Sequence, residues 1–361
     1  MKILLFIWQY NISNFICNLF TLIILINIII FIITSFFINS INTSNLDNGA
    51  FMKIIIFNNK NYLRTLYGFI ALLFLFVETY KNLEIFIFFG HLLIGNFFIK
   101  IVKLYLIIFI IFTIYIKNLI NSTKIYNLQF FMYTFLIVEM LQLLWCVTTL
   151  TAIIFILDTL NILLYLLILN NNSLNKKLNN DTILFVGLAT FFWVSFFSTA
   201  VFFIAVLYFF IIFFTANISL ITLISICMVY ELNIFSQLKI SFTIFLFIIF
   251  FFIKCGIAPV FYWKTAFLKS MSLGVLSFYI IVYFSTVFLF FINFLLINFY
   301  IFNNLIKLIS FISCTIALII VSYTLTSVND ITTFLVFSSI LNCLVILITV
   351  STVFNTAILF I

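Results

Sequence analysis

Apolar runs of about the length of a membrane span recur along nearly the whole sequence, and they constrain the fold more than any other feature. A transmembrane helix needs about 20 such residues to cross roughly 30 Å of hydrocarbon. Hydrophobic residues make up 67% of the chain and charged residues only 7%, whereas a soluble domain is about a quarter charged. The runs are continuous, which indicates helices and not an outer-membrane barrel. We therefore predict an all-α polytopic membrane protein, with residues 1 to 361 forming a single integral membrane domain.

Apolar length and polar breaks predict about ten transmembrane helices. Their expected ranges are 15–38, 66–80, 96–116, 129–147, 152–169, 183–213, 240–263, 274–300, 305–325 and 331–352. The segment from 83 to 98 is compatible with a short membrane-surface helix. The range 183 to 213 is long enough to be tilted or broken.

Basic residues favour alternate connections between the predicted helices. The connections after the first, third, fifth and seventh helices carry Lys53, Lys60, Arg64, Lys117, Lys124, Lys176, Lys177, Lys264 and Lys269. Matrix or cytoplasmic loops collect Lys and Arg, so this pattern places the N-terminus on the opposite side. The net charge of +8 is then a topology signal, and no nucleic-acid partner is expected.

The composition also favours Phe, Ile, Leu, Asn, Tyr and Lys, which are the residues of AT-rich codons. This bias is typical of an organellar genome. The N-terminus MKILLFIWQYNISNF lacks the Arg-rich, Ser-rich character of a transit peptide. We therefore expect a mitochondrially encoded, multi-pass protein of the inner membrane, with its N-terminus in the intermembrane space.

Residues that hold cofactors or metals form no recognisable pattern. The six cysteines have no paired spacing, which favours buried thiols over a metal site or a disulfide framework. His91 is the single histidine and has no companions at metal-ligand spacing, so a structural role is expected for it. Because there is no Gly-rich phosphate loop either, we expect no cofactor and no redox chemistry in this chain.

The stretch KCGIAPVFYW, residues 254 to 263, places a lysine and the single proline of the chain inside an apolar run. Proline lacks an N–H and clashes with the carbonyl four residues before it, here Cys255, while Gly256 loosens the same turn. We predict a broken helix near Pro259. Non-helical backbone at that depth lines protein or water, so Lys254 would exchange protons there. The alternative is that Lys254 snorkels to the surface beside a passive kink.

Asp158 is a second charge within an apolar segment. Thr151, seven positions before it, and Asn161 and Tyr165, three and seven positions after it, lie at helical spacings that put all four residues on one face. A carboxylate there needs a cationic partner, and Lys254 is the natural candidate. The alternative is a structural cap or interhelical hydrogen bond.

Glu139 is flanked by LIV and MLQLLWCV, again within apolar sequence. Ionisable groups inside spans are costly, by about 2.5 to 3.5 kcal/mol on insertion scales, and each is a functional candidate. Glu139 is either a second acid in the same network or a packed, protonated carboxyl.

Three motifs in register resemble the antiporter-like membrane subunits of respiratory complex I. KCGIAPVFYW is similar to the family's Lys-x-Gly-x-x-Pro-x-His-x-Trp signature on a broken seventh helix. DTLNILLYLL, residues 158 to 167, is similar to Glu-Leu-x-Ser-Leu-x-x-Tyr-x-Leu, and VNDITTFLVFSSILN, residues 328 to 342, to a third family motif. The resemblance covers roughly residues 90 to 361 and is closest to the subunit 2 branch of NADH dehydrogenase.

The resemblance implies a proton-translocating subunit with no redox centre of its own. Lys254 and Asp158 would form the relay, with a nearby carboxylate holding the proton on the lysine and its withdrawal releasing it. Asn161, Tyr165 and Glu139 are secondary candidates. Flavin, iron-sulfur clusters and quinone would be held by other subunits, and the implied partners are the other membrane-arm subunits and membrane lipids.

Several positions depart from the family pattern. Asp158 stands for a glutamate, Phe261 and Asn342 for histidines, and Phe284 and Thr182 for lysines, and Thr332 and Thr333 stand for a Lys-Arg pair. The chain also ends where the family's eleventh helix would begin, which leaves two alternatives: a separate chain supplies the C-terminal helices, or the subunit has lost the exit half of its relay. The departures leave two alternatives open: a structural, non-conducting subunit, and a free-standing ion transporter.

Overall fold

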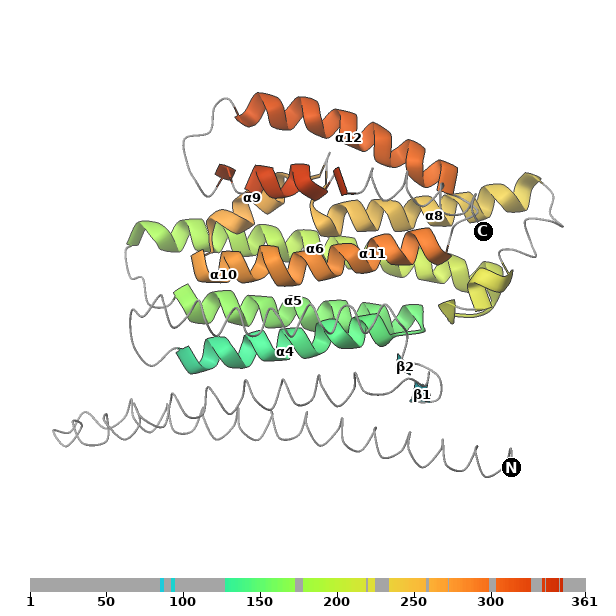
Figure 1. The fold of residues 1–361 in the computed structure, drawn as a ribbon, viewed down its shortest axis with the longest axis horizontal. Coiled ribbons are helices and arrows are strands. Elements are labelled where there is room, and N and C mark those ends of the chain that lie inside the picture. The colour runs from blue at the N-terminus through green and yellow to red at the C-terminus, as the bar shows by residue number, and fades with distance from the viewer. Residues whose placement is uncertain are drawn as a thin grey trace. The chain divides into compact units, whose positions relative to one another are not determined.

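A computed structural model describes most of the chain beyond residue 126 and two short segments before it (Figure 1). The described residues are 85–87, 92–94, 127–172, 178–218, 220–224, 234–257, 260–271, 273–298, 303–325, 333–334, 336–343 and 345–346. The first three predicted spans lie outside these residues, as do His91, Pro259, Cys17 and Cys227.

The chain divides into two compact units, Met1–Val147 and Thr148–Ile361. The single membrane domain expected from the sequence stays a prediction.

The first unit contains a two-stranded hairpin where a surface helix was expected. β1 (Ile85–Ile87) pairs antiparallel with β2 (Leu92–Ile94), with Phe86 opposite Leu93. The helix prediction for residues 83 to 98 is therefore wrong at these six positions. Short apolar runs of β-branched and aromatic residues have no periodicity that separates strand from helix, so pairing decides between them. The same unit contains helix α4 (Asn127–Cys146), which agrees with the predicted range 129–147.

The second unit is helical. Its elements are α5 (Leu150–Asn172), α6 (Leu178–Phe213), α8 (Ile234–Cys255), α9 (Tyr262–Lys269), α10 (Leu273–Phe278), the π-helix η1 (Tyr279–Phe284), α11 (Ser285–Asn298) and α12 (Asn303–Leu325). The helical fold class is confirmed for the described residues apart from the hairpin. Five stretches in them are long and apolar enough to cross a membrane, as expected of a multi-pass membrane protein.

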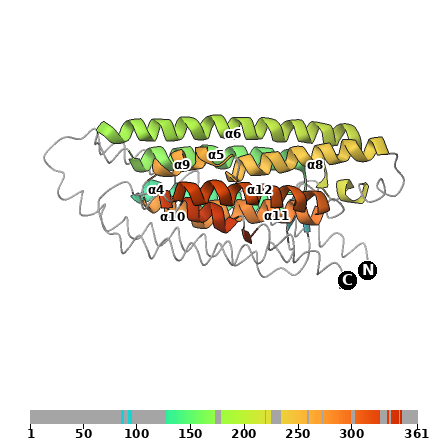
Figure 2. The same cartoon turned by 90° about the horizontal axis from the view of Figure 1, so that it is seen from above.

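The long helices of this unit lie side by side with their axes roughly aligned (Figures 1 and 2). α6 packs against α5, α8 and α9, and it continues for 36 residues without interruption. α8 instead ends at Cys255, eight positions before the end predicted from the apolar run. α10, η1 and α11 follow one another directly from Leu273 to Asn298.

Aromatic side chains fill the core between α6, α8 and α11. Phe202 of α6 stacks on Phe250 of α8, with ring centroids 4.3 Å apart, and Phe250 meets Phe291 of α11 edge to face at 5.2 Å. All three rings are buried. Such pairs contribute about 0.5 to 1.5 kcal/mol each beyond the apolar area that they bury.

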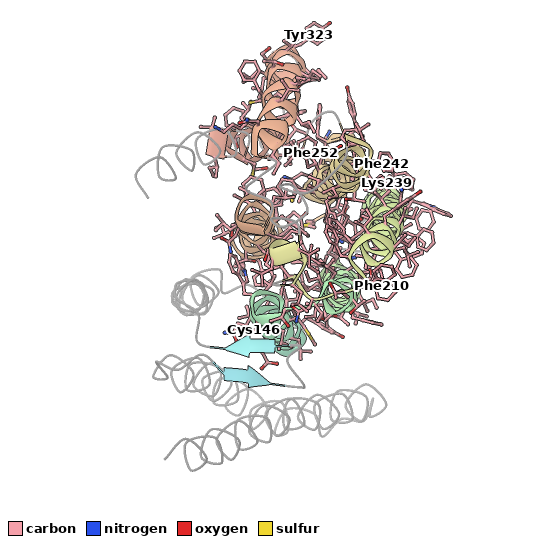
Figure 3. The ribbon with its side chains drawn as sticks, turned by 90° about the vertical axis from the view of Figure 1, so that its right-hand side faces the viewer. Cys146, Phe210, Lys239, Phe242, Phe252 and Tyr323 are labelled. Atoms are coloured by element: carbon pink, nitrogen blue, oxygen red, sulfur yellow. The ribbon has the colours of Figure 1, made fainter. Side chains whose placement is uncertain are left out.

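The outer faces of the same helices are also apolar. Trp193 and Phe196 of α6 and Ile319 of α12 are each more than 60% exposed. Tyr323 of α12 is 81% exposed and projects away from the other helices (Figure 3). An apolar surface of this extent would be unfavourable in water, and it matches contact with lipid.

Candidate functional site

The site forms where α8 ends. The N–H of Ile257 donates to the carbonyl of Phe252 at 3.0 Å, and the N–H of Gly256 donates to that of Ile253 at 3.2 Å. Together with a φ of +59° at Gly256, this is a Schellman motif, in which a left-handed residue terminates an α-helix. Glycine adopts this conformation without a Cβ penalty. The described backbone therefore attributes the end of α8 to Gly256.

Close packing holds α9 beside this helix end. A Cβ on Gly187 of α6 would lie 2.6 Å from the Cβ of Ser270 just after α9, so glycine permits α6 and α9 to approach closely. A Cβ on Gly256 would lie 2.9 Å from the Cδ of Lys264 in α9. Phe191 of α6 stacks on Phe267 of α9 with centroids 4.1 Å apart. These contacts position α9 so that its first turn faces the end of α8.

Lys254, in the last turn of α8, points into the protein. It is 7% exposed, and its Nζ donates to Oδ1 of Asn161 on α5 at 2.7 Å. The hydroxyl of Tyr283 in η1 donates to the same oxygen at 3.5 Å. One amide oxygen thus joins side chains from α5, α8 and η1. This geometry does not match the snorkelling alternative.

The four residues expected on one face of α5 occupy different environments. Asn161 is buried at the lysine, whereas Thr151 is exposed. Asp158 is half-buried and acts on Lys254 electrostatically, but no ion pair joins them. Tyr165 donates to the carbonyl of Leu188 in α6 at 3.3 Å. Asn161, predicted only as a secondary candidate, is therefore the group that contacts the lysine.

Lys264 is a functional candidate that the sequence analysis missed. It was counted among the basic residues of a connection, yet it is 1% exposed. Its Nζ donates to the carbonyl of Cys255 at 3.3 Å and lies 3.4 Å from the centre of the Phe284 ring. One signal was present in the sequence: Lys264 directly follows Trp263, the last residue of the KCGIAPVFYW stretch.

The π-helix η1 contributes two further residues to the site. π-helical turns are rare and often occur at functional sites. Tyr283 and Phe284 are its last two residues, and both are buried. Phe284 is the position at which the family resemblance implies a lysine, and here its ring lies beneath the ammonium of Lys264.

The remaining predicted positions differ in their burial. Glu139 is half-buried on α4 of the first unit, and its place in a relay stays a prediction. Phe261 is fully buried, whereas Thr182 and Asn342 are exposed. Cys146, Cys255, Cys314 and Cys343 are buried, in agreement with the prediction of buried thiols for the cysteines that the structure describes.

No protein-family model matches the chain. No curated protein matches it either.

The chemistry of the site therefore has to be inferred from its own groups. An amide oxygen accepts an N–H from a charged ammonium and equally from a neutral amine, so Asn161 can hold Lys254 in both protonation states. A contacting carboxylate would instead favour only the charged state. The arrangement suits a lysine that gains and loses a proton without changing its place.

Proposed function

We propose that this chain is a proton-translocating membrane-arm subunit of NADH:ubiquinone oxidoreductase, with no redox centre of its own. The observation that supports it most is the buried Lys254 ammonium, which is bonded to the neutral Asn161 and acted on by Asp158. The three motifs that resemble the antiporter-like subunits support the same function. Conformational change driven by quinone reduction in other subunits would supply the energy.

In this mechanism Lys254 carries the proton. One N–H bond of the ammonium breaks, the proton passes to water, and the neutral amine keeps its hydrogen bond to Asn161. Movement of the Asp158 carboxylate relative to the amine would change how firmly the proton is held. Substrate and product are both protons, so no electron enters this chain.

The proposal includes a place for the chain in the cell. We place it in the mitochondrial inner membrane, with about ten spans and its N-terminus in the intermembrane space. α8 and α9 would be the two halves of one broken membrane helix, with Gly256 and Pro259 at the break. Other membrane-arm subunits and lipids would surround it.

The first experiment tests membership of the complex. Detergent-solubilised mitochondrial membranes are separated under native conditions, and the band with NADH dehydrogenase activity is analysed by peptide mass spectrometry. Peptides of this chain should migrate there with the other membrane-arm subunits. Migration at low mass, apart from that band, would contradict the proposal and favour a free-standing ion transporter.

The second experiment tests the lysine. Lys254→Met in the assembled complex should lower the number of protons pumped per electron while NADH oxidation and assembly persist. Lys239→Met is the matched control, because Lys239 lies on the same helix and is exposed. An unchanged ratio in Lys254→Met would remove Lys254 from the mechanism.

A structural, non-conducting subunit is the second candidate. Two positions support it, because Phe284 and Thr182 stand where the resemblance implies lysines. Thr182 is also exposed, whereas a residue of a proton path would be buried. For such a subunit, Lys254→Met would impair assembly or have no effect. It would not uncouple an assembled enzyme.

A further inference from the structure

The burial of Lys264 needs a physical reason. Removing an ammonium from water costs several kcal/mol even after relaxation, and burial is usually offset by a carboxylate partner. In the part of the chain that the structure describes, no carboxylate contacts Lys264. The ammonium is held by one carbonyl oxygen and one aromatic face. Because no ion pair has to be separated, its proton can leave without abandoning a counter-charge.

Lys254 and Lys264 are both linked to the end of α8 and to η1. In each of these two elements, the residues that link to the two lysines are consecutive. In α8, Lys254 is followed directly by Cys255, whose carbonyl accepts from Lys264. In η1, Tyr283 shares the Asn161 oxygen with Lys254, and the next residue, Phe284, carries the ring beneath Lys264. Both lysines are therefore buried at the same two elements, the end of α8 and η1.

α9 also holds an unsatisfied donor. Trp263 precedes Lys264 in α9, and its Nε1 is buried without a hydrogen-bond partner in the described part of the chain. An unpaired buried N–H costs about 1 to 3 kcal/mol, so such a group is a ready donor to a water molecule. The Tyr283 hydroxyl, which shares the Asn161 oxygen with Lys254, is a second polar group that can orient water.

From these contacts we infer that Lys264 is a second proton-carrying residue that exchanges its proton with Lys254. An N–H bond of one ammonium breaks, water accepts that proton, and the water gives a proton to the neutral amine of the other lysine. No electrons move, and one positive charge leaves one lysine as another forms on its neighbour. This inference rests on the proposed function of Lys254.

The experiment compares three lysine variants in the assembled complex. Lys264→Met removes the amine, and Lys264→Arg keeps a permanent cation and its donors but does not release a proton. Lys269→Met is the matched control, since Lys269 lies on the same helix and is exposed. The readouts are the proton-to-electron ratio, NADH oxidation and the amount of assembled complex.

We expect Lys264→Met and Lys264→Arg to lower the proton-to-electron ratio by as much as Lys254→Met, with Lys269→Met unchanged. A full ratio in Lys264→Arg would show that Lys264 is only a fixed cation capping α8, and would overturn the inference. Loss of the assembled complex in both variants would overturn it too, because the ammonium would then be needed for folding. If Lys254→Met itself leaves the ratio unchanged, the proposed function fails; if only the Lys264 variants do so, the inference alone fails.

Discussion

α6 and the region from the end of α8 through η1 satisfy their polar groups differently. In α6 the hydroxyls of Thr190, Ser195 and Ser198 each donate to a carbonyl three residues earlier. At the end of α8 the donors reach other elements, as Lys254 does to Asn161, 93 positions away. An uninterrupted helix meets its hydrogen-bonding needs locally. A helix that ends inside the protein exposes groups that only tertiary partners can satisfy.

The largest expected effect comes from interrupting α6. Phe203→Pro removes a helical N–H and crowds the carbonyl four residues earlier, at a cost of about 3 kcal/mol or more. Phe203 is half exposed on the outer face, so the control Phe203→Ala should cost far less. The unfolding midpoint of the detergent-solubilised protein measures both. Equal midpoints would mean that α6 does not depend on its continuity.

Asn161→Leu tests the tertiary partner at the other region. It leaves the Lys254 ammonium without its acceptor, and hydrogen bonds to charged groups contribute about 1.5 to 3 kcal/mol. Thr159→Val is the control on the same helix, because the Thr159 hydroxyl bonds only locally, to the carbonyl of Ile156. In a denaturing detergent, Asn161→Leu should lose clearly more stability than Thr159→Val. Equal losses would refute the contrast between local and tertiary bonding.

Gly256→Ala tests the helix end itself. A non-glycine residue at a φ of +59° costs about 1 to 2 kcal/mol, and the added Cβ would press on the Lys264 stem. We expect a lower unfolding midpoint together with a lower proton-to-electron ratio, because both lysines lie at this turn. If the unfolding midpoint falls while the proton-to-electron ratio stays at its wild-type value, the helix end contributes to stability and not to transport.

Gly187→Ala should have the most easily reversed effect. The added Cβ would meet Ser270, and overpacking costs typically about 1 to 3 kcal/mol. Because this strain is steric and not conformational, the double variant Gly187→Ala with Ser270→Gly should recover much of the midpoint. Failure of the second substitution to recover any stability would place the strain elsewhere.

The sequence predicts the regular helices well and the interruptions less well. The ranges expected for α4 and α12 agree with the structure to within about two residues, because apolar length and polar ends determine such helices. The end of α8 was placed at 263 and lies at Cys255, since a left-handed glycine leaves no mark in hydropathy. Lys264 was taken for a loop charge because its burial depends on packing against the end of α8 and η1, which no local pattern contains.

The sequence predicted the residues of the candidate site better than the contacts between them. Lys254 and Asn161 were both named, but the direct partner of the lysine was expected to be Asp158. Helical spacing places residues on one face without saying which of them meets a neighbouring helix. Tyr283 had no sequence signal, because its position depends on the π-helical turn.

The π-helix also changes how positions before and after it correspond. An i to i+5 turn accommodates an extra residue, and one residue in an α-helix is a rotation of about 100°. A periodic pattern extended from α10 into α11 as if the helix were regular would therefore assign the wrong side to every residue after Phe284. Pairs of cysteines placed seven apart across η1 for cross-linking would face different neighbours, whereas pairs within α11 would face the same one.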